Sequence, residues 1–157
     1  MIATELAALL ARDLTRLVQQ LRAFPDQESL WKTAPGVANS AGNLALHLEG
    51  NLREYIGRQL GNIPYERQRP LEFSDKGLPV QDMVARIEHV RQVIPGVIQG
   101  LSSAALDAPY PEQVLGVPLT TRQFLIHLLG HLNYHLGQID YLRRITTGTG
   151  AIVLAGL

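Results

Sequence analysis

Apolar residues recur every three or four positions along four separate stretches of the chain, with polar residues between them. That spacing is typical of amphipathic α-helices, which turn one face toward a core. It predicts four helices, over residues 4–21, 40–60, 80–99 and 121–146. No stretch reads convincingly as a strand, so the pattern predicts an all-α protein.

Capping and breaking residues mark the ends of these helices. Asn39 or Ser40 can cap the second helix, and Thr120 or Thr121 can cap the fourth, because their side-chain oxygens accept hydrogen bonds from free backbone N–H groups. Pro95 lies inside the apolar pattern of the third helix. It should kink or break that helix near Val93, where its ring meets the preceding backbone.

Proline-rich connections at 63–78 and 106–117 separate the later helices. The first is too long for a tight hairpin and predicts a chain that crosses over the bundle. Trp31 is expected to cover one end of the core. The apolar tail at 151–155 lacks a helical period and should pack on the bundle or on a second subunit. We expect one domain over residues 1–157, a four-helix bundle.

Charge composition narrows the function classes. The 157 residues are 46% apolar, and 14 basic residues balance 14 acidic ones, giving a formal net charge of zero. That balance argues against nucleic acid and a polybasic membrane surface as partners. No apolar run is long enough to span a bilayer, and the N-terminus lacks the basic region of a signal peptide. We therefore expect a cytoplasmic protein.

The chain has no cysteine, so disulfides and thiolate ligands are excluded. Any transition metal must be bound by His, Asp or Glu side chains. This restriction directs attention to the histidines.

Three histidines, His127, His131 and His135, follow one another at four-residue steps. On an α-helix such a step rises about 6 Å and turns about 40°, so His131 and His135 project side by side. His127 lies one turn earlier, rotated further round. His47 lies in the second predicted helix, among apolar residues. We expect His47, His131 and His135 to meet inside the bundle and bind one divalent metal ion.

The alternative is that each histidine is a hydrogen-bonded core residue, which is common for a lone His on an apolar face. The pair His131 and His135, four residues apart on one helix, is a more specific indication of a metal site than a lone His. Gly130 and Gly137 also lie inside the fourth helix, where each costs about 1 kcal/mol relative to Ala. Their presence predicts close approach of a neighbouring backbone.

Polar residues near the histidines could orient the imidazoles. A ligating imidazole usually donates its second N–H to a nearby acceptor. Gln138 lies three residues beyond His135, and Asn51 and Glu54 follow His47 on its helix. These three are the predicted orienting residues. The alternative is that Gln138 and Asn51 are merely polar residues at one end of the bundle. His89 is expected to face solvent.

The spacing of His131 and His135 is shared with the zinc-protease helix. Those enzymes need Glu directly after the first His as general base, and Leu132 stands there instead. The sequence therefore argues against a protease of that class.

Two segments together resemble the DinB-like superfamily, also called the YfiT-like metal-dependent hydrolases. They read NLALHLEGNL at 43–52 and HLNYHLGQI at 131–139. The resemblance extends over nearly the whole chain through helix order, the long second connection and the late HxxxHxGQ motif.

The resemblance implies an up-down-down-up bundle with a metal, often nickel or zinc, held by His47, His131 and His135. His127 is then a flanking pocket residue. Imidazole ligands alone suit iron, copper, zinc and nickel alike, and manganese is a further candidate. The family is often dimeric, so a homodimer is expected. Some relatives use a low-molecular-weight thiol.

Two hypotheses for function follow. The first is a metal-dependent enzyme of the thiol S-transferase or hydrolase kind acting on a small molecule, with Glu54 or Tyr134 moving protons. Three imidazoles would leave a coordination position open, as in catalytic zinc sites. The second is a dimeric binding or stress-response module that the metal stabilises without turnover.

Overall fold

The computed structural model describes residues 2–156, and four long helical segments dominate it. They are α1 (Ile2–Arg22), a continuous rod made of α3 (Ala41–Leu52), η1 (Arg53–Arg58) and α4 (Gln59–Gly61), α6 (Val80–Gln99) and α8 (Thr121–Thr147). The short helices α2 (Gln27–Trp31), α5 (Arg69–Ser74) and α7 (Ser103–Asp107) lie in the connections. Within residues 2–156 the only β-pairing is an isolated bridge between Pro109 and Thr120.

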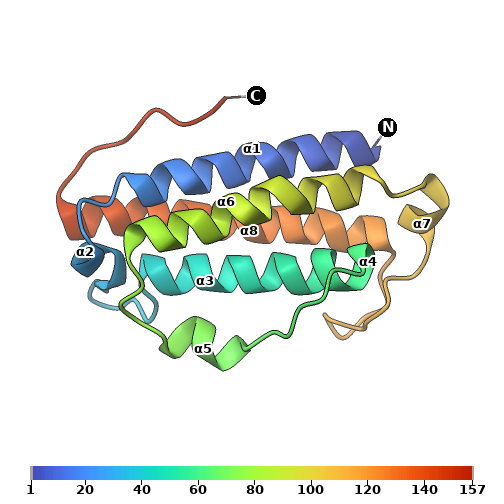
Figure 1. Ribbon diagram of the computed structural model, residues 1–157, viewed down its shortest axis with the longest axis horizontal. Helices are drawn as coiled ribbons and strands as arrows, with labels where there is room; N and C mark the ends of the chain where they lie inside the picture. The colour runs from blue at the N-terminus through green and yellow to red at the C-terminus, as the bar shows by residue number, and fades with distance from the viewer. Residues whose placement is uncertain (1, 157) are drawn as a thin grey trace.

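The four long segments form an up-down-down-up bundle (Figure 1). Helix α1 packs against α6 and α8, and α3 packs against the same two helices from the opposite side. Because α3 and α6 run in the same direction, the chain must return along the whole bundle between them, and α5 lies on that return path (Figure 1). The predicted fold class and crossing connection are therefore confirmed.

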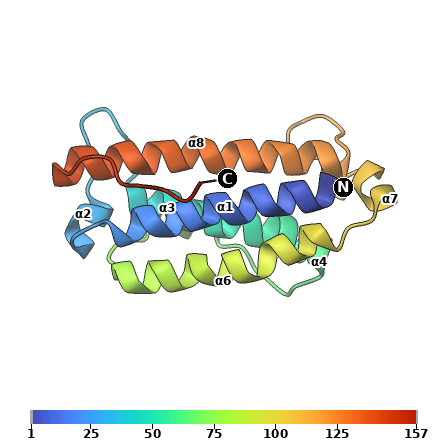
Figure 2. The same ribbon diagram turned by 90° about the horizontal axis from the view of Figure 1, so that it is seen from above.

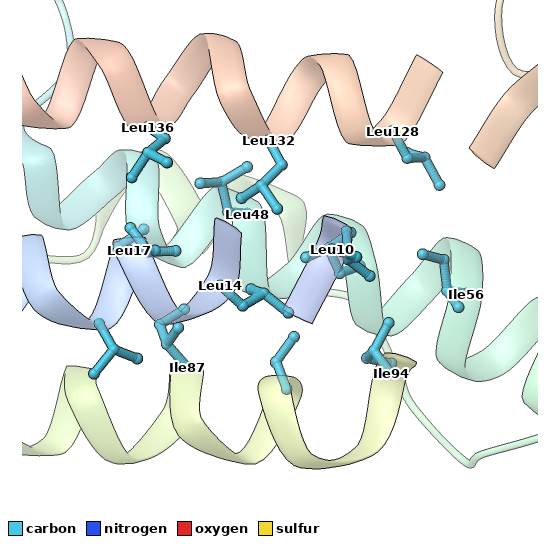
Figure 3. Close-up of a cluster of buried hydrophobic side chains, with 14 of the residues drawn as sticks. Leu10, Leu14, Leu17, Leu48, Ile56, Ile87, Ile94, Leu128, Leu132 and Leu136 are labelled. Carbon is cyan, nitrogen blue, oxygen red and sulfur yellow. The ribbon is translucent and has the colours of Figure 1, made fainter. Parts of the chain in front are cut away.

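Leucine and isoleucine side chains from all four helices fill the centre of the bundle (Figure 3). Full burial of each such side chain contributes about 1.5–3 kcal/mol relative to exposure. The labelled members of this core are Leu10, Leu14, Leu17, Leu48, Ile56, Ile87, Ile94, Leu128, Leu132 and Leu136.

The predicted caps are present. Ser40 accepts a hydrogen bond from the Asn43 N–H at the start of α3. Thr120 and Gln123 form a reciprocal capping box at the start of α8. Asn62 follows α4 and ends the rod formed by α3, η1 and α4; its backbone is in the left-handed conformation, with φ of 51°.

Local structure differs from prediction in three places. Helix α6 continues through Pro95 without the predicted break, and Ile94 and Ile98 nearby are buried in the core. Helix α5 forms inside the connection predicted to be irregular. The second rod contains a π-helical turn, η1, and such turns are frequent near functional sites.

The two remaining segments pack on the bundle. Trp31 closes one end of the core: its indole N–H donates to the Leu78 carbonyl at 3.0 Å. The C-terminal tail lies along α1 (Figure 2), where the Ala155 backbone bonds to both Arg16 and Gln19. Among the described helices, none combines the length and apolarity needed to cross a membrane.

Candidate metal centre

The three predicted ligands meet between two antiparallel helices. His47 projects from α3, and His131 and His135 project from successive turns of α8. His131 Nε2 lies 3.2 Å from His47 Nε2 and 3.1 Å from His135 Nε2. The structure thus brings together a three-histidine group that could hold a metal ion.

The spacing of the nitrogens fits a small transition-metal ion. Zinc–nitrogen bonds of about 2.0–2.1 Å in a tetrahedral site place the ligand nitrogens roughly 3.3 Å apart. The two measured separations lie close to that value. These two separations suit nitrogens that share one ion, and the ligand atoms of all three histidines lie within 4.8 Å of one another.

The outer nitrogen of His47 is held by an ion pair from α5 and the chain just before it. His47 Nδ1 lies 2.9 Å from Glu72 Oε2. Arg67 donates to the same carboxylate through Nε at 2.6 Å and through a terminal nitrogen at 2.9 Å. The ionised Glu72 carboxylate can only accept hydrogen bonds, so His47 donates to it from Nδ1. The Nε2 atom of His47 then carries a lone pair that points toward the other two histidines.

Gln138 orients the His135 ring in the way that Glu72 orients His47. Its amide oxygen lies 2.6 Å from His135 Nδ1. An amide oxygen only accepts, so His135 also turns an Nε2 lone pair inward. His131 Nδ1 is buried and has no hydrogen-bond partner among the described residues. A proton on His131 Nε2 can be donated to the Nε2 lone pair of His47 or to that of His135, but not fully to both. A cation between the rings can instead bind the Nε2 atoms of all three histidines.

The ionisation of the site also favours a cation. Burial and the nearby His135, His47 and His127 lower the pKa of His131 to about 4. Burial likewise lowers the pKa of His135, against the opposing effect of the hydrogen bond that His135 donates to Gln138. These histidines are therefore neutral at pH 7, which is the form that binds metals.

Glu72, in contrast, is held as an anion. Burial alone would raise its pKa, but the hydrogen bonds from His47 and Arg67 and the charge of Arg67 outweigh that effect and keep the pKa below its ordinary value. Gly50 makes room for this carboxylate, since an added Cβ there would overlap the Glu72 side chain. Phe73 covers the His47 ring at a centroid distance of 5.0 Å.

The other predicted residues lie around the three ligands in different ways. His127 is exposed and stacks on His131 with ring centroids 6.3 Å apart. Tyr134 is exposed, with its ring edge-on to His135 at 5.3 Å. Glu54 is paired with Arg58 instead of a histidine. Asn51 is buried, and its Oδ1 has no partner among the described residues.

Two further predictions have clear outcomes. The expected close approach at Gly130 and Gly137 is wrong within this chain, because nothing described lies within 4 Å of a Cβ added at either position. Both glycines lie on the outward side of α8. His89 faces solvent, as predicted.

Sequence reasoning missed Glu72 and Arg67. They lie in the proline-rich connection, where neither helical periodicity nor a motif marks them. The available signal was indirect: an Arg and a Glu spaced five residues apart in the segment that crosses the bundle.

Comparison with known proteins agrees with this geometry. The sequence matches the profile of the DinB superfamily over residues 9–139. The chain belongs to the DinB superfamily. Its fold is similar to that of a DinB-like protein from Bacillus cereus ATCC 10987, with a TM-score of 0.66 and 19% sequence identity. That match covers 90% of this chain and 91% of the other. A search of curated proteins gave no significant match.

The DinB profile covers all three histidines of the site. The family assignment rests on the sequence match, and the structural likeness at this identity supports the shared helical fold. In this DinB protein, the fold places its three-histidine group between α3 and α8, with α5 supplying Glu72.

Proposed function

We propose that this DinB protein binds one divalent metal ion through Nε2 of His47, His131 and His135, and uses it in a thiol S-transfer or hydrolysis reaction on a small molecule. The observation that carries the proposal is the convergence of three imidazoles whose outer partners, Glu72 and Gln138, turn lone pairs toward one point. Nickel and zinc are the leading candidates, since both accept imidazole ligands.

When bound by three imidazoles, such an ion keeps an open coordination position and favours the ionised form of a thiol or water at neutral pH. The chain's own residues prepare for this. Glu72 and Gln138 fix the ring orientations of His47 and His135, and burial keeps His131 neutral. Ligands that are held in place before binding lose less conformational freedom when the ion enters.

Tyr134 and Glu54 are the candidates for moving a proton. Tyr134 is exposed beside His135, whereas the carboxylate of Glu54 is engaged by Arg58. Since no residue among those described engages the Tyr134 hydroxyl, Tyr134 is the better placed of the two. Tyr134→Phe should lower turnover while metal content stays at the wild-type level, because the ring is kept. A comparable loss with Glu54→Gln, and none with Tyr134→Phe, would reverse the assignment.

A polar surface pocket lies behind His47, on the side of its outer nitrogen Nδ1 and away from the nitrogens that face the metal position. Its volume is about 480 Å³, within the usual range for small-molecule sites. Its lining carries both signs of charge, including Arg67, Arg69 and Glu66. Arg67 lies between this pocket and the outer side of the His47 ring, because one of its terminal nitrogens lies 3.4 Å from His47 Nδ1.

Elemental analysis of untagged protein tests the metal site directly. We expect about one equivalent of a divalent metal in the wild type and in His89→Ala, a control that removes an exposed histidine elsewhere. His135→Ala should lose the metal. Retention of metal by His135→Ala, or failure of metal-free protein to bind added nickel or zinc, would contradict the proposed site.

Turnover then separates the enzyme from the alternative of a metal-stabilised binding or stress-response module. Metal-loaded protein is screened for thiol transfer to electrophiles and for hydrolysis. Activity that is lost in His135→Ala supports the enzyme. An inert protein whose metal exchanges no water would favour the module.

A further inference from the structure

A pocket of about 370 Å³ lies at the end of the bundle where α3 begins and α8 ends (Figure 1). Three large apolar or aromatic side chains stand exposed in its lining, with exposed fractions of 41% for Val37, 63% for Tyr141 and 61% for Ile145. The core residues Leu44 and Leu142 line it as well. Exposed apolar side chains that gather around a hollow of this size are typical of a small-molecule site.

A β-turn in the loop before α3 holds one rim of this pocket in shape. The Val37 N–H donates to the Ala34 carbonyl at 3.0 Å, and Gly36 has a φ of 77°. Proline at the second position and glycine at the third are the type II pattern. Pro35 fixes its own φ, and Gly36 adopts the left-handed region without a Cβ penalty. The rim that carries Val37 is therefore formed before any ligand arrives.

The polar groups of this lining indicate which class of molecule it suits. Among the described residues that line it, none is Asp, Glu, Lys, Arg or His. Its polar side-chain groups are the amides of Asn39 and Gln138 and the hydroxyl of Tyr141, all of which are neutral. A charged ligand would lose hydration here without meeting an opposite charge. The lining therefore favours an uncharged, mainly apolar molecule.

Gln138 belongs both to this pocket and to the candidate metal centre. Its amide oxygen lies 2.6 Å from His135 Nδ1, and its Nε2 group donates to no other described residue. Because the oxygen is engaged by His135, the NH₂ group is the part of Gln138 that a ligand can use. A carbonyl oxygen is the matching acceptor.

We propose that this pocket binds an uncharged, mainly apolar small molecule whose carbonyl oxygen accepts a hydrogen bond from Gln138 Nε2. The pocket lies on the outer side of His135, so the ligand touches the metal site only through Gln138. Binding itself does not require the metal.

A link between ligand and metal follows through Gln138, and this link rests on the proposed metal site. A metal at His135 Nε2 keeps the ring proton on Nδ1, so the amide oxygen must face His135 and the NH₂ group must face away. Without metal, the His135 tautomer and the amide can both reverse. If the two arrangements are equally populated, metal should tighten ligand binding about twofold. The ligand should then tighten metal binding by the same factor.

Fluorescence titration of metal-free protein with Prodan tests the pocket. Prodan is an uncharged naphthalene with one ketone, and its emission shifts to shorter wavelength when it leaves water. Anilinonaphthalene sulfonate, an anion of similar size, is the charged comparison. Prodan should bind about tenfold more tightly than the anion, because the lining offers no cation to pair with a sulfonate. Tighter binding of the anion would overturn the proposed ligand class.

Two isoleucines on α8 place the probe on the protein. Ile145→Glu puts a charge in the lining and should raise the Prodan dissociation constant about tenfold. Ile126→Glu is the matched control, since Ile126 is also exposed on α8 but does not line the pocket. Neither change should reduce the helix content measured by circular dichroism. An unchanged Prodan dissociation constant in Ile145→Glu, or an equal rise in both variants, would overturn the proposal.

The role of Gln138 is tested by a neutral substitution of similar length. In metal-free protein, Gln138→Met should weaken Prodan binding about fivefold, which corresponds to the loss of one hydrogen bond of about 1 kcal/mol. Dimethylaminonaphthalene, which lacks the ketone, should bind Gln138→Met and wild type alike. Equal weakening of the two probes would mean that Gln138 donates no hydrogen bond to the carbonyl.

Metal titration separates this proposal from the proposed function. If the protein binds no metal, the proposed metal site fails, while the Prodan titrations still decide the pocket. If the protein binds nickel or zinc, the Prodan dissociation constant should fall about twofold when the metal is present. A metal-loaded protein with an unchanged Prodan dissociation constant would overturn the link through Gln138.

Discussion

Glu72 connects the crossing segment of the bundle to the candidate metal centre. Its carboxylate accepts from His47 on one side and from Arg67 on the other. The first contact decides which imidazole nitrogen faces the metal, and the second holds the carboxylate in position. Partners of this kind commonly change metal affinity by about 10–100-fold when removed.

Glu72→Gln should therefore weaken metal binding by about 10–100-fold with little change in helix content. An amide leaves Arg67 without its charged partner and can offer His47 a donor in place of an acceptor. The dissociation constant is measured by competition with a chromogenic chelator. Glu66→Gln, an exposed glutamate on the same connection, is the control. Equal affinities in the two variants would mean that Glu72 does not orient the ligand.

Gly50→Ala should have a similar effect by a steric route. The added methyl group would overlap the Glu72 carboxylate and push it away from His47. Alanine normally stabilises a helix interior by about 1 kcal/mol relative to glycine. Gly96→Ala, with open space, should show that gain in urea unfolding, whereas Gly50→Ala should lose both stability and metal affinity. Wild-type affinity in Gly50→Ala would show that Glu72 can shift without consequence.

Sequence spacing could identify some residues of the site and not others. His131, His135 and Gln138 lie on consecutive turns of one helix, so their geometry follows directly from helical periodicity. Glu72 comes from a connection whose path depends on the tertiary fold. Arg143 shows the same limit: cations near the C-terminal end of a helix usually interact with its dipole at the surface, and nothing in the spacing around Arg143 indicates otherwise. It is in fact buried, and it donates to Gln20 at 2.7 Å.

At the scale of elements, the long helices were predictable because their caps and their apolar spacing agree. Thr120 illustrates this, since it both precedes the apolar pattern of α8 and forms a capping box. The same local rules failed for α5. Its Pro70 suggested irregular chain, yet proline in the first turn suits a helix start because that N–H needs no helical partner. The π-helical turn η1 has no signature in the apolar pattern.

Thr120→Ala should lower the free energy of unfolding by about 1 kcal/mol, because the first turn of α8 loses its side-chain acceptor. Urea unfolding monitored by circular dichroism gives this value. Ser103→Ala is a suitable control, since Ser103 is an exposed residue in the first turn of α7 whose neighbour Ser102 provides the cap. If Thr120→Ala and Ser103→Ala unfolded alike, the capping box would contribute nothing measurable.

At the scale of the whole molecule, periodicity alone predicts four helices but leaves their directions open. The up-down-down-up order was implied by the family resemblance, and the long second connection is consistent with it. Physically, that connection is what allows α3 and α6 to run parallel (Figure 1). It also carries Glu72 past His47, so the topology of the bundle and the geometry of the metal centre depend on the same segment.

Metal removal should leave the bundle folded, because its core is complete without the site. The leucines and isoleucines in Figure 3 join all four helices, and none of them is a metal ligand. At a free metal concentration of 100 times the dissociation constant, metal binding should raise the free energy of unfolding by about 2.7 kcal/mol. For a chain of this size that corresponds to a rise in melting temperature of roughly 5–10 °C.

Thermal unfolding of metal-free and metal-loaded protein measures that difference, with His135→Ala as the variant that should not respond to added metal. Retained helix content with a modest shift is the behaviour of a site built onto a self-sufficient fold, in which the ion is available for chemistry. Loss of most helix in the metal-free protein would instead make the ion part of the framework. The non-catalytic alternative would then explain the three histidines better than the enzyme does.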